Sequence, residues 1–468
     1  MAGHSVPTRR IVLFTSALGS SLAPFMVSSL IVALPTIGRD FSADAVLLGW
    51  LTTAFFLAAA TFLVPMGRFA DIYGVKKVFS AGILVYGVSA FLCVIAPSIF
   101  FLLAARFLTG IGAAMIFGTS IALLSLVFPE EDRGIAIGIN VTAMSAGFLL
   151  GFLAGGFLTA AVGWRVIFVL VIPVSILVTA IIRFMIPGEC ALARNRKTDT
   201  GGSVLYGVSL FLVIVGCTSL PSFTGLFMLI AGAMAGGLFI RYENRRESPL
   251  FDIRLFVANR VFVRANMVVL LVWTGSFAIT FLATLYLQDV KGFDPVTAGF
   301  ILLFQTMVSI FMGPSAGRLS DRKNPALVAS AGVILMLSGF LPFLFLTQDT
   351  PVSLIVIAFL VQGLGLIMYQ PALARLVVSS VDQERYGLAS STVESMRLIG
   401  VTLSLAITVT TFSLLLGGAS ITPETVPAFL SATRAIMAAF SVIVLIGLFV
   451  CLTLRQGSIH EPVDELSD

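Results

Sequence analysis

The sequence has few charged side chains, and this scarcity decides its class. Only 11% of its 468 residues are Asp, Glu, Lys or Arg, whereas soluble globular proteins carry about 25%. Histidine is nearly absent too, because His4 and His460 are the only two and both lie near the ends of the chain. Hydrophobic residues make up 58% of the chain, and the mean hydropathy is +1.07. This composition excludes an ordinary soluble protein and indicates an integral protein of the lipid bilayer.

Motifs for metal, nucleotide or catalytic chemistry are missing as well. The four cysteines (Cys93, Cys190, Cys217 and Cys451) are scattered without the spacing of a metal site or a disulfide framework. The sequence contains no nucleotide-binding P-loop and no catalytic motif in its loops. The net charge of +5 comes from basic residues in short loops and does not indicate a nucleic-acid partner. We therefore expect no metal, no cofactor and no enzymatic or ATP-driven activity.

Long apolar segments follow one another along almost the whole chain. A membrane-spanning helix needs about 20 predominantly apolar residues. Because the first such run continues to about Ile37, we interpret it as a helix and not as a signal peptide. The sequence predicts an all-α membrane protein with fourteen spanning helices, near 11–36, 47–66, 78–96, 98–127, 134–160, 164–186, 202–220, 222–241, 261–288, 296–317, 326–346, 351–378, 388–416 and 429–453.

The basic residues set the expected orientation. If the N-terminus is inside, twenty of the 28 Lys and Arg residues lie on inner segments, three lie on outer loops and five lie within apolar segments. The three outer ones are Arg39, Arg165 and Lys291. Basic residues concentrate on the cytoplasmic side of membrane proteins. We therefore expect a multi-pass protein of the cell membrane with both termini in the cytoplasm.

Two related halves are indicated by a repeat. The stretch GRFADIYGVKK (67–77) returns as GRLSDRKN (317–324), again between two apolar segments. Offsets of 250–253 residues relate Gly67 to Gly317, Asp71 to Asp321, Gly110 to Gly363, Gly112 to Gly365 and Arg133 to Arg385. Both copies start on the same side of the membrane, so we predict parallel repeats with a cavity between them. The predicted domains are 1–186, a six-helix bundle; 187–260, linkers and two inserted helices; 261–454, a second six-helix bundle; and 455–468, a cytoplasmic tail.

Several motifs resemble those of the major facilitator superfamily, in its branch of fourteen-helix drug–proton antiporters. Residues 67–77 are similar to the signature between helices 2 and 3, although Ile72 and Val75 stand where arginines are usual. The stretch GFLLGFLAGG (147–156) resembles the helix 5 antiporter motif with Phe152 in place of its proline. RFLTGIGAA (106–114), WRVIFVLVIP (164–173), ESPLFDIRLF (247–256) and YLQDVKG (286–292) are also similar to that branch. The resemblance implies the major facilitator fold and ion-driven transport, usually proton-coupled export of organic compounds.

One departure from the family concerns the first helix. Members commonly carry an acidic residue a few positions before ALP, and here the stretch FMVSSLIVALP (25–35) has Met26 there. Arg106 lies at a similar depth in the fourth helix, so the usual acid–arginine pair lacks its acid. Two interpretations stay open for Arg106: a structural one, in which it bonds helix carbonyls or hydroxyls, and a functional one, in which it meets a substrate anion or gates a proton site.

Glu394 is the one acidic residue that we place well inside an apolar segment. Arg397 follows three residues later, close enough on a helix surface to form an ion pair. The pair is either structural or a site of proton coupling, and the sequence leaves both open. If protons are coupled, Glu394 is the expected carrier, with Arg397 and Arg106 tuning it.

Further site residues are assigned by spacing or by analogy with the superfamily. Gly147, Gly151 and Gly155 recur every four residues, so we expect a face for close helix packing, which in the family lies between the halves. We also expect Asp71 to pair with Arg133, and Asp321 with Arg385, as a latch beside Gly67 and Gly317. By analogy the cavity is lined by Met26, Arg106, Trp273, Tyr286, Gln305, Gln362 and Tyr369.

Together these features favour a secondary active transporter that binds a small organic substrate and protons and works as a monomer. The leading hypothesis is proton-coupled export of hydrophobic or cationic organic compounds. A second is a carrier of an organic anion anchored by Arg106. A third is a membrane sensor that does not transport, and the missing acid in the first helix favours the second and third.

Overall fold

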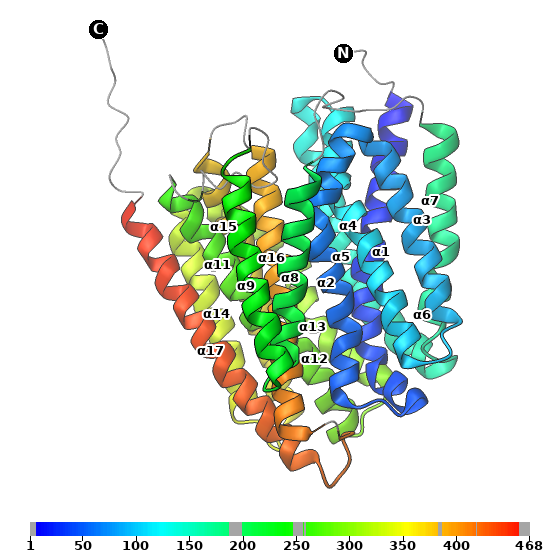
Figure 1. Cartoon of the computed structure of the whole chain (residues 1–468), viewed down its shortest axis with the longest axis vertical. Helices are drawn as coiled ribbons and strands as arrows, with labels where there is room; N and C mark the ends of the chain where they lie inside the picture. Colours follow the sequence, from blue (N-terminus) through cyan, green and yellow to red (C-terminus); the bar gives the residue numbers. More distant parts are fainter. Residues whose placement is uncertain are drawn as a thin grey trace.

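Helices account for all the regular structure in the described part of the chain. A computed structural model describes residues 6–186, 199–246, 256, 259–381, 386–417 and 419–457. Within these ranges fourteen helical segments are long and apolar enough to cross a membrane. The prediction of an all-α membrane protein with fourteen spanning helices is therefore confirmed. Because that number is even, the start of the first span and the end of the last span lie on the same side, and Figure 1 shows both of these helix ends toward one end of the molecule. We call this end the terminus side and the opposite end the far side.

The N-terminal half is a bundle of six spans. Its elements are α1 (Val6–Phe41), α2 (Ala45–Tyr73), α3 (Val75–Val94), α4 (Ile99–Val127), α5 (Glu130–Ala161) and the broken sixth span α6 (Val166–Val169) and α7 (Val171–Met185). Helix α1 packs on α5, α4 packs on both α2 and α3, and α3 packs on α7.

The C-terminal half repeats this packing. Its elements are α11 (Arg260–Ser276), α12 (Ala278–Leu285), the π-helical turn η1 (Tyr286–Val290), α13 (Pro295–Arg322), α14 (Pro325–Leu344), α15 (Val352–Ser379), α16 (Tyr386–Leu416) and α17 (Val426–Gly457). Helix α11 packs on α16, α15 packs on both α13 and α14, and α14 packs on α17. Each contact matches one in the first half, in the order of parallel repeats. The predicted boundaries of the domains stay a prediction.

Short polar residues at the helix starts explain where the chain turns. The side chain of Asp44 accepts a hydrogen bond of 2.7 Å from the amide of Leu47 and caps α2. Asp294 caps α13 in the same way, and hydrogen bonds from Thr297 and the Val296 amide lower the pKa of its carboxyl group. Gly74 separates α2 from α3 at a φ of 116°, a conformation that side chains with a Cβ disfavour.

The inserted helices α8 (Thr200–Thr218) and α9 (Phe223–Glu243) lie outside the two bundles (Figure 1). Helix α8 packs on α2 of one half and on α16 of the other, while α9 packs on α8. The hydroxyl of Tyr206 donates to the carbonyl of Ala60 on α2 at 3.0 Å, and Thr410 on α16 donates to the carbonyl of Cys217 at 2.7 Å. Helix α8 therefore bridges the seam between the halves.

The two halves touch at the far side. A Cβ on Gly156 of α5 would lie 2.6 Å from the carbonyl oxygen of Pro295, and one on Gly299 of α13 would lie 2.5 Å from that of Phe152. A Cβ on Gly49 of α2 would likewise lie 2.5 Å from Cγ2 of Val409 on α16. The halves approach each other so closely at these three glycines that an added Cβ would collide with backbone atoms or with Val409.

Toward the terminus side the halves diverge. Gly138 lies on the same face of α5 as Gly156, because 18 residues make five helical turns. A Cβ on Gly138 would nevertheless meet no atom within 4 Å. Figure 1 shows a molecule that is wider at the end that carries the termini. The closest contacts between the halves therefore lie at the far side, and the helices spread apart toward the terminus side.

Candidate functional site

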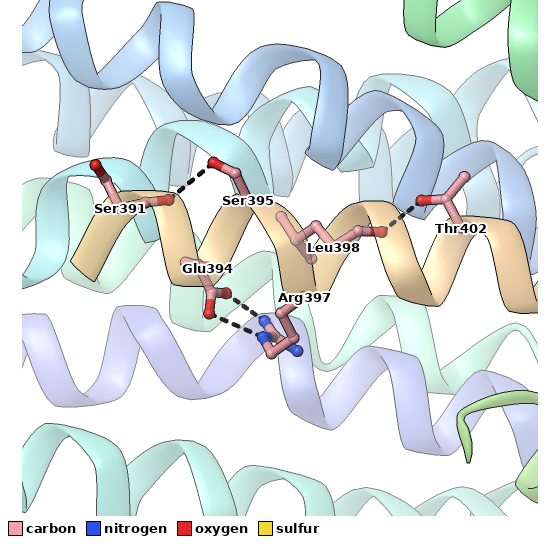
Figure 2. Close-up of polar contacts among 6 residues, drawn as sticks. All are labelled: Ser391, Glu394, Ser395, Arg397, Leu398 and Thr402. Carbon is pink, nitrogen blue, oxygen red and sulfur yellow. Dashed lines mark hydrogen bonds and ion pairs between the residues drawn. The ribbon is translucent and has the colours of Figure 1, made fainter. Parts of the chain in front are cut away.

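Glu394 and Arg397 form an ion pair on α16, as their spacing predicted. The guanidinium of Arg397 donates through Nε to Oε2 of Glu394 at 2.8 Å and through Nη2 to Oε1 (Figure 2). The Glu394 side chain is 32% exposed and that of Arg397 is 19% exposed. Both oxygens of the carboxylate thus meet one edge of the guanidinium, the strongest geometry for this pair, and the protein leaves about a third of the Glu394 side chain uncovered.

A tryptophan of a neighbouring helix lies against this pair. A Cβ on Gly400 would lie 2.9 Å from Cβ of Trp273, so α11 approaches α16 very closely here. Cζ of Arg397 then lies 5.3 Å from the centre of the Trp273 ring, within the range of a cation–π contact. The half-buried indole therefore connects the ion pair to α11.

The other polar groups around the pair bond to their own helix. Thr392 donates to the carbonyl of Leu388 at 2.8 Å, and Ser395 to that of Ser391 at 2.8 Å; Figure 2 shows the second bond beside the ion pair. Hydroxyl groups on a helix commonly donate to the preceding turn in this way. These hydroxyls do not compete with Arg397 for the carboxylate.

Arg106 lies inside the N-terminal half and is completely buried, with 0% of its surface exposed. Its Nη1 lies 3.1 Å from the sulfur of Met26 on α1, and its Cζ lies 4.7 Å from the centre of the Phe55 ring on α2. Nε and Nη2 make no hydrogen bond. Met26 is therefore next to Arg106, as their similar depths suggested, and the sulfur is a weak acceptor where the family has a carboxylate.

The other neighbours of Arg106 are uncharged groups of α3. The hydroxyl of Tyr86 and the thiol of Cys93 lie close enough to interact with the guanidinium electrostatically. Tyr86 donates its own proton to the carbonyl of Leu22 at 3.3 Å. None of these groups carries a negative charge that would balance the guanidinium.

The cavity candidates of the C-terminal half lie at different places. Tyr286 is buried near the far side, where its hydroxyl donates to the carbonyl of Thr347 at 2.7 Å. Gln305 is half-buried, and its Oε1 lies 3.4 Å from the hydroxyl of Thr280. Gln362 and Tyr369 are buried in α15, and the polar atoms of both side chains make no hydrogen bond. A role of these residues in substrate binding stays a proposal.

The glycines of α5 contact α1 within their own half. A Cβ on Gly147 would lie 2.5 Å from the carbonyl oxygen of Ser21, and one on Gly155 would lie 2.5 Å from Cα of Ser29. A Cβ on Gly151 would collide with the hydroxyl of Ser28. We expected these three glycines to contact the other half. That contact is made instead by Gly156, which neighbours Gly155 but lies on another face of the helix.

Sequence reasoning missed two further contacts between the halves. Gln288, in the turn η1, donates from Nε2 to the carbonyl of Val32 on α1 at 2.8 Å. Phe56 of α2 and Phe277, between α11 and α12, also meet across the seam with ring centres 4.8 Å apart. The motif YLQDVKG drew attention to this segment, but no sequence signal indicated its partner.

The latch residues are only partly described. Gly67 and Asp71 lie near the end of α2 on the terminus side, and Arg133 lies in the first turns of α5. Arg385 and the side chain of Asp321 lie outside the described residues, as does the environment of Gly317. Both pairings, Asp71 with Arg133 and Asp321 with Arg385, stay predictions.

Comparison with known sequences places the chain among membrane transporters. Residues 16–405 match the model of the Major Facilitator Superfamily. The chain is 24% identical over 396 residues to the riboflavin transporter RibZ of Clostridioides difficile (strain 630), covering 85% of this chain and 86% of RibZ. It is 30% identical over 412 residues to the multidrug resistance protein Stp of Mycobacterium tuberculosis (strain CDC 1551 / Oshkosh), covering 86% and 75%. It is 28% identical over 418 residues to the multidrug efflux pump LfrA of Mycolicibacterium smegmatis (strain ATCC 700084 / mc(2)155), covering 87% and 82%.

Solved structures share the fold. A bacterial homologue of the human lysosomal transporter Spinster, in an inward-facing and unoccupied conformation, superimposes with a TM-score of 0.73 at 19% identity. The match covers 98% of this chain and all of that one. The peptide transporter POT in complex with sulfate gives a TM-score of 0.70 at 14% identity, with 95% of each chain covered.

Proposed function

The chain belongs to the major facilitator superfamily, a family of membrane transporters and not of enzymes, and we propose that it exports hydrophobic organic compounds in exchange for protons. The relatives named for multidrug resistance and efflux support the export of organic compounds. A riboflavin transporter is also among the relatives, so the transported compound differs between members of the family. The substrate would bind between the halves, which open alternately to the two sides.

The observation that carries the proposed proton coupling is the position of Glu394. In the described spans every other acidic residue lies within two residues of an end, whereas Glu394 lies six residues inside the span Leu388–Leu416. An ionisable group at such depth is expensive and is a functional candidate by default. The protein leaves its side chain 32% exposed, which suits a group that exchanges protons.

The ion pair suggests how protons and substrate are exchanged. In this conformation the ionised carboxylate of Glu394 is held by Arg397. A proton taken up on the far side would neutralise Glu394, break the ion pair and free Arg397. Release of the proton on the terminus side would restore the pair and ready the site for the next substrate molecule. The two charge states of Glu394 would in this way favour opposite steps of the cycle.

We place the terminus side in the cytoplasm and the chain in the cell membrane. The support is the distribution of basic residues in the sequence, with twenty on the segments expected inside and three on the loops expected outside. With this orientation the conformation is inward-facing. Substrate would enter from the cytoplasm or the inner leaflet, and the close contacts of Gly156, Gly299 and Gly49 would seal the outer side.

The test is dye transport in proteoliposomes, with Glu394→Gln as the variant and Glu424→Gln, at an exposed loop position, as its matched control. Wild type and Glu424→Gln should move fluorescent organic dyes against their gradient when a proton gradient is imposed. Glu394→Gln should lose this driven transport and keep dye-for-dye exchange. Full driven transport by folded Glu394→Gln would remove Glu394 as the carrier. If the wild type moves none of the dyes, with or without a gradient, the proposed export is wrong and a sensor becomes the better hypothesis.

A further inference from the structure

Arg106 is a permanently charged group without a charged partner. A guanidinium is not deprotonated in proteins, and this one is fully buried. Burying a charge without a partner costs several kcal/mol. The Phe55 ring at 4.7 Å and the Met26 sulfur at 3.1 Å offset only part of that cost. A hydrophobic side chain at this position would avoid the cost, so the charge points to a ligand.

The unused donors of Arg106 form one edge of the guanidinium. Nε and Nη2 point the same way, and neither makes a hydrogen bond. In Arg397 this same edge, Nε with Nη2, binds both oxygens of the Glu394 carboxylate. The protein thus contains one arginine whose Nε–Nη2 edge holds a carboxylate and a second whose edge has the same shape and charge and no partner.

Met26, the neighbour of Arg106, stands on a helix that reaches the other half. It lies on α1, which also contacts α12 and α13 of the other half. Methionine is unbranched and adapts its shape easily. A rotation of the Met26 side chain would expose the guanidinium toward the interface, where the fold binds its substrate. A carboxylate that entered there could replace the weak sulfur contact with two charge-assisted hydrogen bonds.

We propose that Arg106 is the binding site for a carboxylate group of the transported compound. This inference rests on the proposed transport function and selects its substrate class, an aromatic or otherwise hydrophobic organic acid. A cationic compound would meet repulsion from Arg106, and the one carboxylate deep in a described span, that of Glu394, is already held by Arg397. The electrostatics of the described spans therefore favour the anionic alternative.

The experiment measures binding of matched compounds to purified full-length protein. The probes are several aromatic carboxylic acids of different ring size, each paired with its methyl ester, which has the same shape without the charge. In the wild type at least one acid should bind about tenfold or more tightly than its ester, the factor that corresponds to 1.4 kcal/mol. Equal affinities in every pair, or no binding of any acid, would overturn the proposal.

Two substitutions of Met26 identify the site. Met26→Glu supplies an internal carboxylate to Arg106 and should bring the ratio of acid to ester affinity close to one. Met26→Gln has nearly the same shape without the charge and should keep the preference for the acid. Arg106→Gln should abolish the preference as Met26→Glu does, and it provides a second reading if the glutamate variant does not fold. A preference that survives both Met26→Glu and Arg106→Gln would place the carboxylate elsewhere.

Failure of this inference is distinguishable from failure of the proposed function. Dye transport driven by a proton gradient, with no preference for acids over esters in binding, would support the proposed export and contradict a carboxylate site at Arg106. A clear preference for acids, without transport of any compound, would support the carboxylate site and contradict the proposed export. Each outcome changes only one of the two proposals.

Discussion

Replacing Met26 by glutamate should stabilise the folded protein. The sulfur lies 3.1 Å from Nη1 of Arg106, and a glutamate in the same rotamer would place its carboxyl carbon near the position of the sulfur and its oxygens beside the guanidinium. Opposite charges about 4 Å apart attract by about 4 kcal/mol at an effective dielectric constant of about 20. Burying the new carboxylate offsets part of this gain. We expect Met26→Glu to exceed Met26→Gln in free energy of unfolding by about 1–3 kcal/mol.

The comparison of the two variants isolates the charge. Glutamate and glutamine have nearly the same volume, so any cavity or strain created by replacing methionine is common to both. The assay is thermal unfolding in detergent followed by intrinsic tryptophan fluorescence, with monodispersity checked by size-exclusion chromatography. If the glutamate variant unfolds at the same temperature as the glutamine variant or below it, the claim that Arg106 lacks a charged partner is wrong.

Three further predictions concern the packing. Gly151→Ala should lower the thermal stability by about 1–3 kcal/mol, because its Cβ would collide with Ser28, whereas Gly138→Ala on the same helix has open space and should not. Gly156→Ala should disturb the far-side closure and raise the labelling of an engineered cysteine between the halves by an impermeant reagent; unchanged labelling would contradict the assigned seal. Tyr206→Phe should cost about 1 kcal/mol by removing the bond to Ala60, and an unchanged melting temperature would mean that α8 is not held there.

The fold was predictable because the bilayer imposes simple rules. Length and hydropathy fix a spanning helix, so fourteen segments could be read from the sequence. The repeat of charged turns and glycines predicted two parallel halves, and the order of helix contacts in the structure follows it. The i,i+3 spacing of Glu394 and Arg397 likewise predicted a contact, because such residues are neighbours on a helix surface.

The partner of each helix face was harder to predict. The spacing of Gly147, Gly151 and Gly155 indicated a close contact but not its partner, which is α1 and not the opposite half. Periodicity locates a face on one helix, whereas the neighbour depends on how all the helices pack. The same reason explains why the contact of Gln288 with Val32 had no signal in the sequence. The position of α8 across the seam also depends on two helices far apart in the chain.

The central claim, proton exchange at Glu394, is tested most directly by counting protons when substrate binds. Purified protein in weakly buffered detergent is mixed with a transported compound, and a pH indicator reports the protons released. The account predicts net proton release from the wild type within a series of starting pH values, and none from Glu394→Gln with binding retained. Equal release from both proteins would show that the coupled proton is not on Glu394.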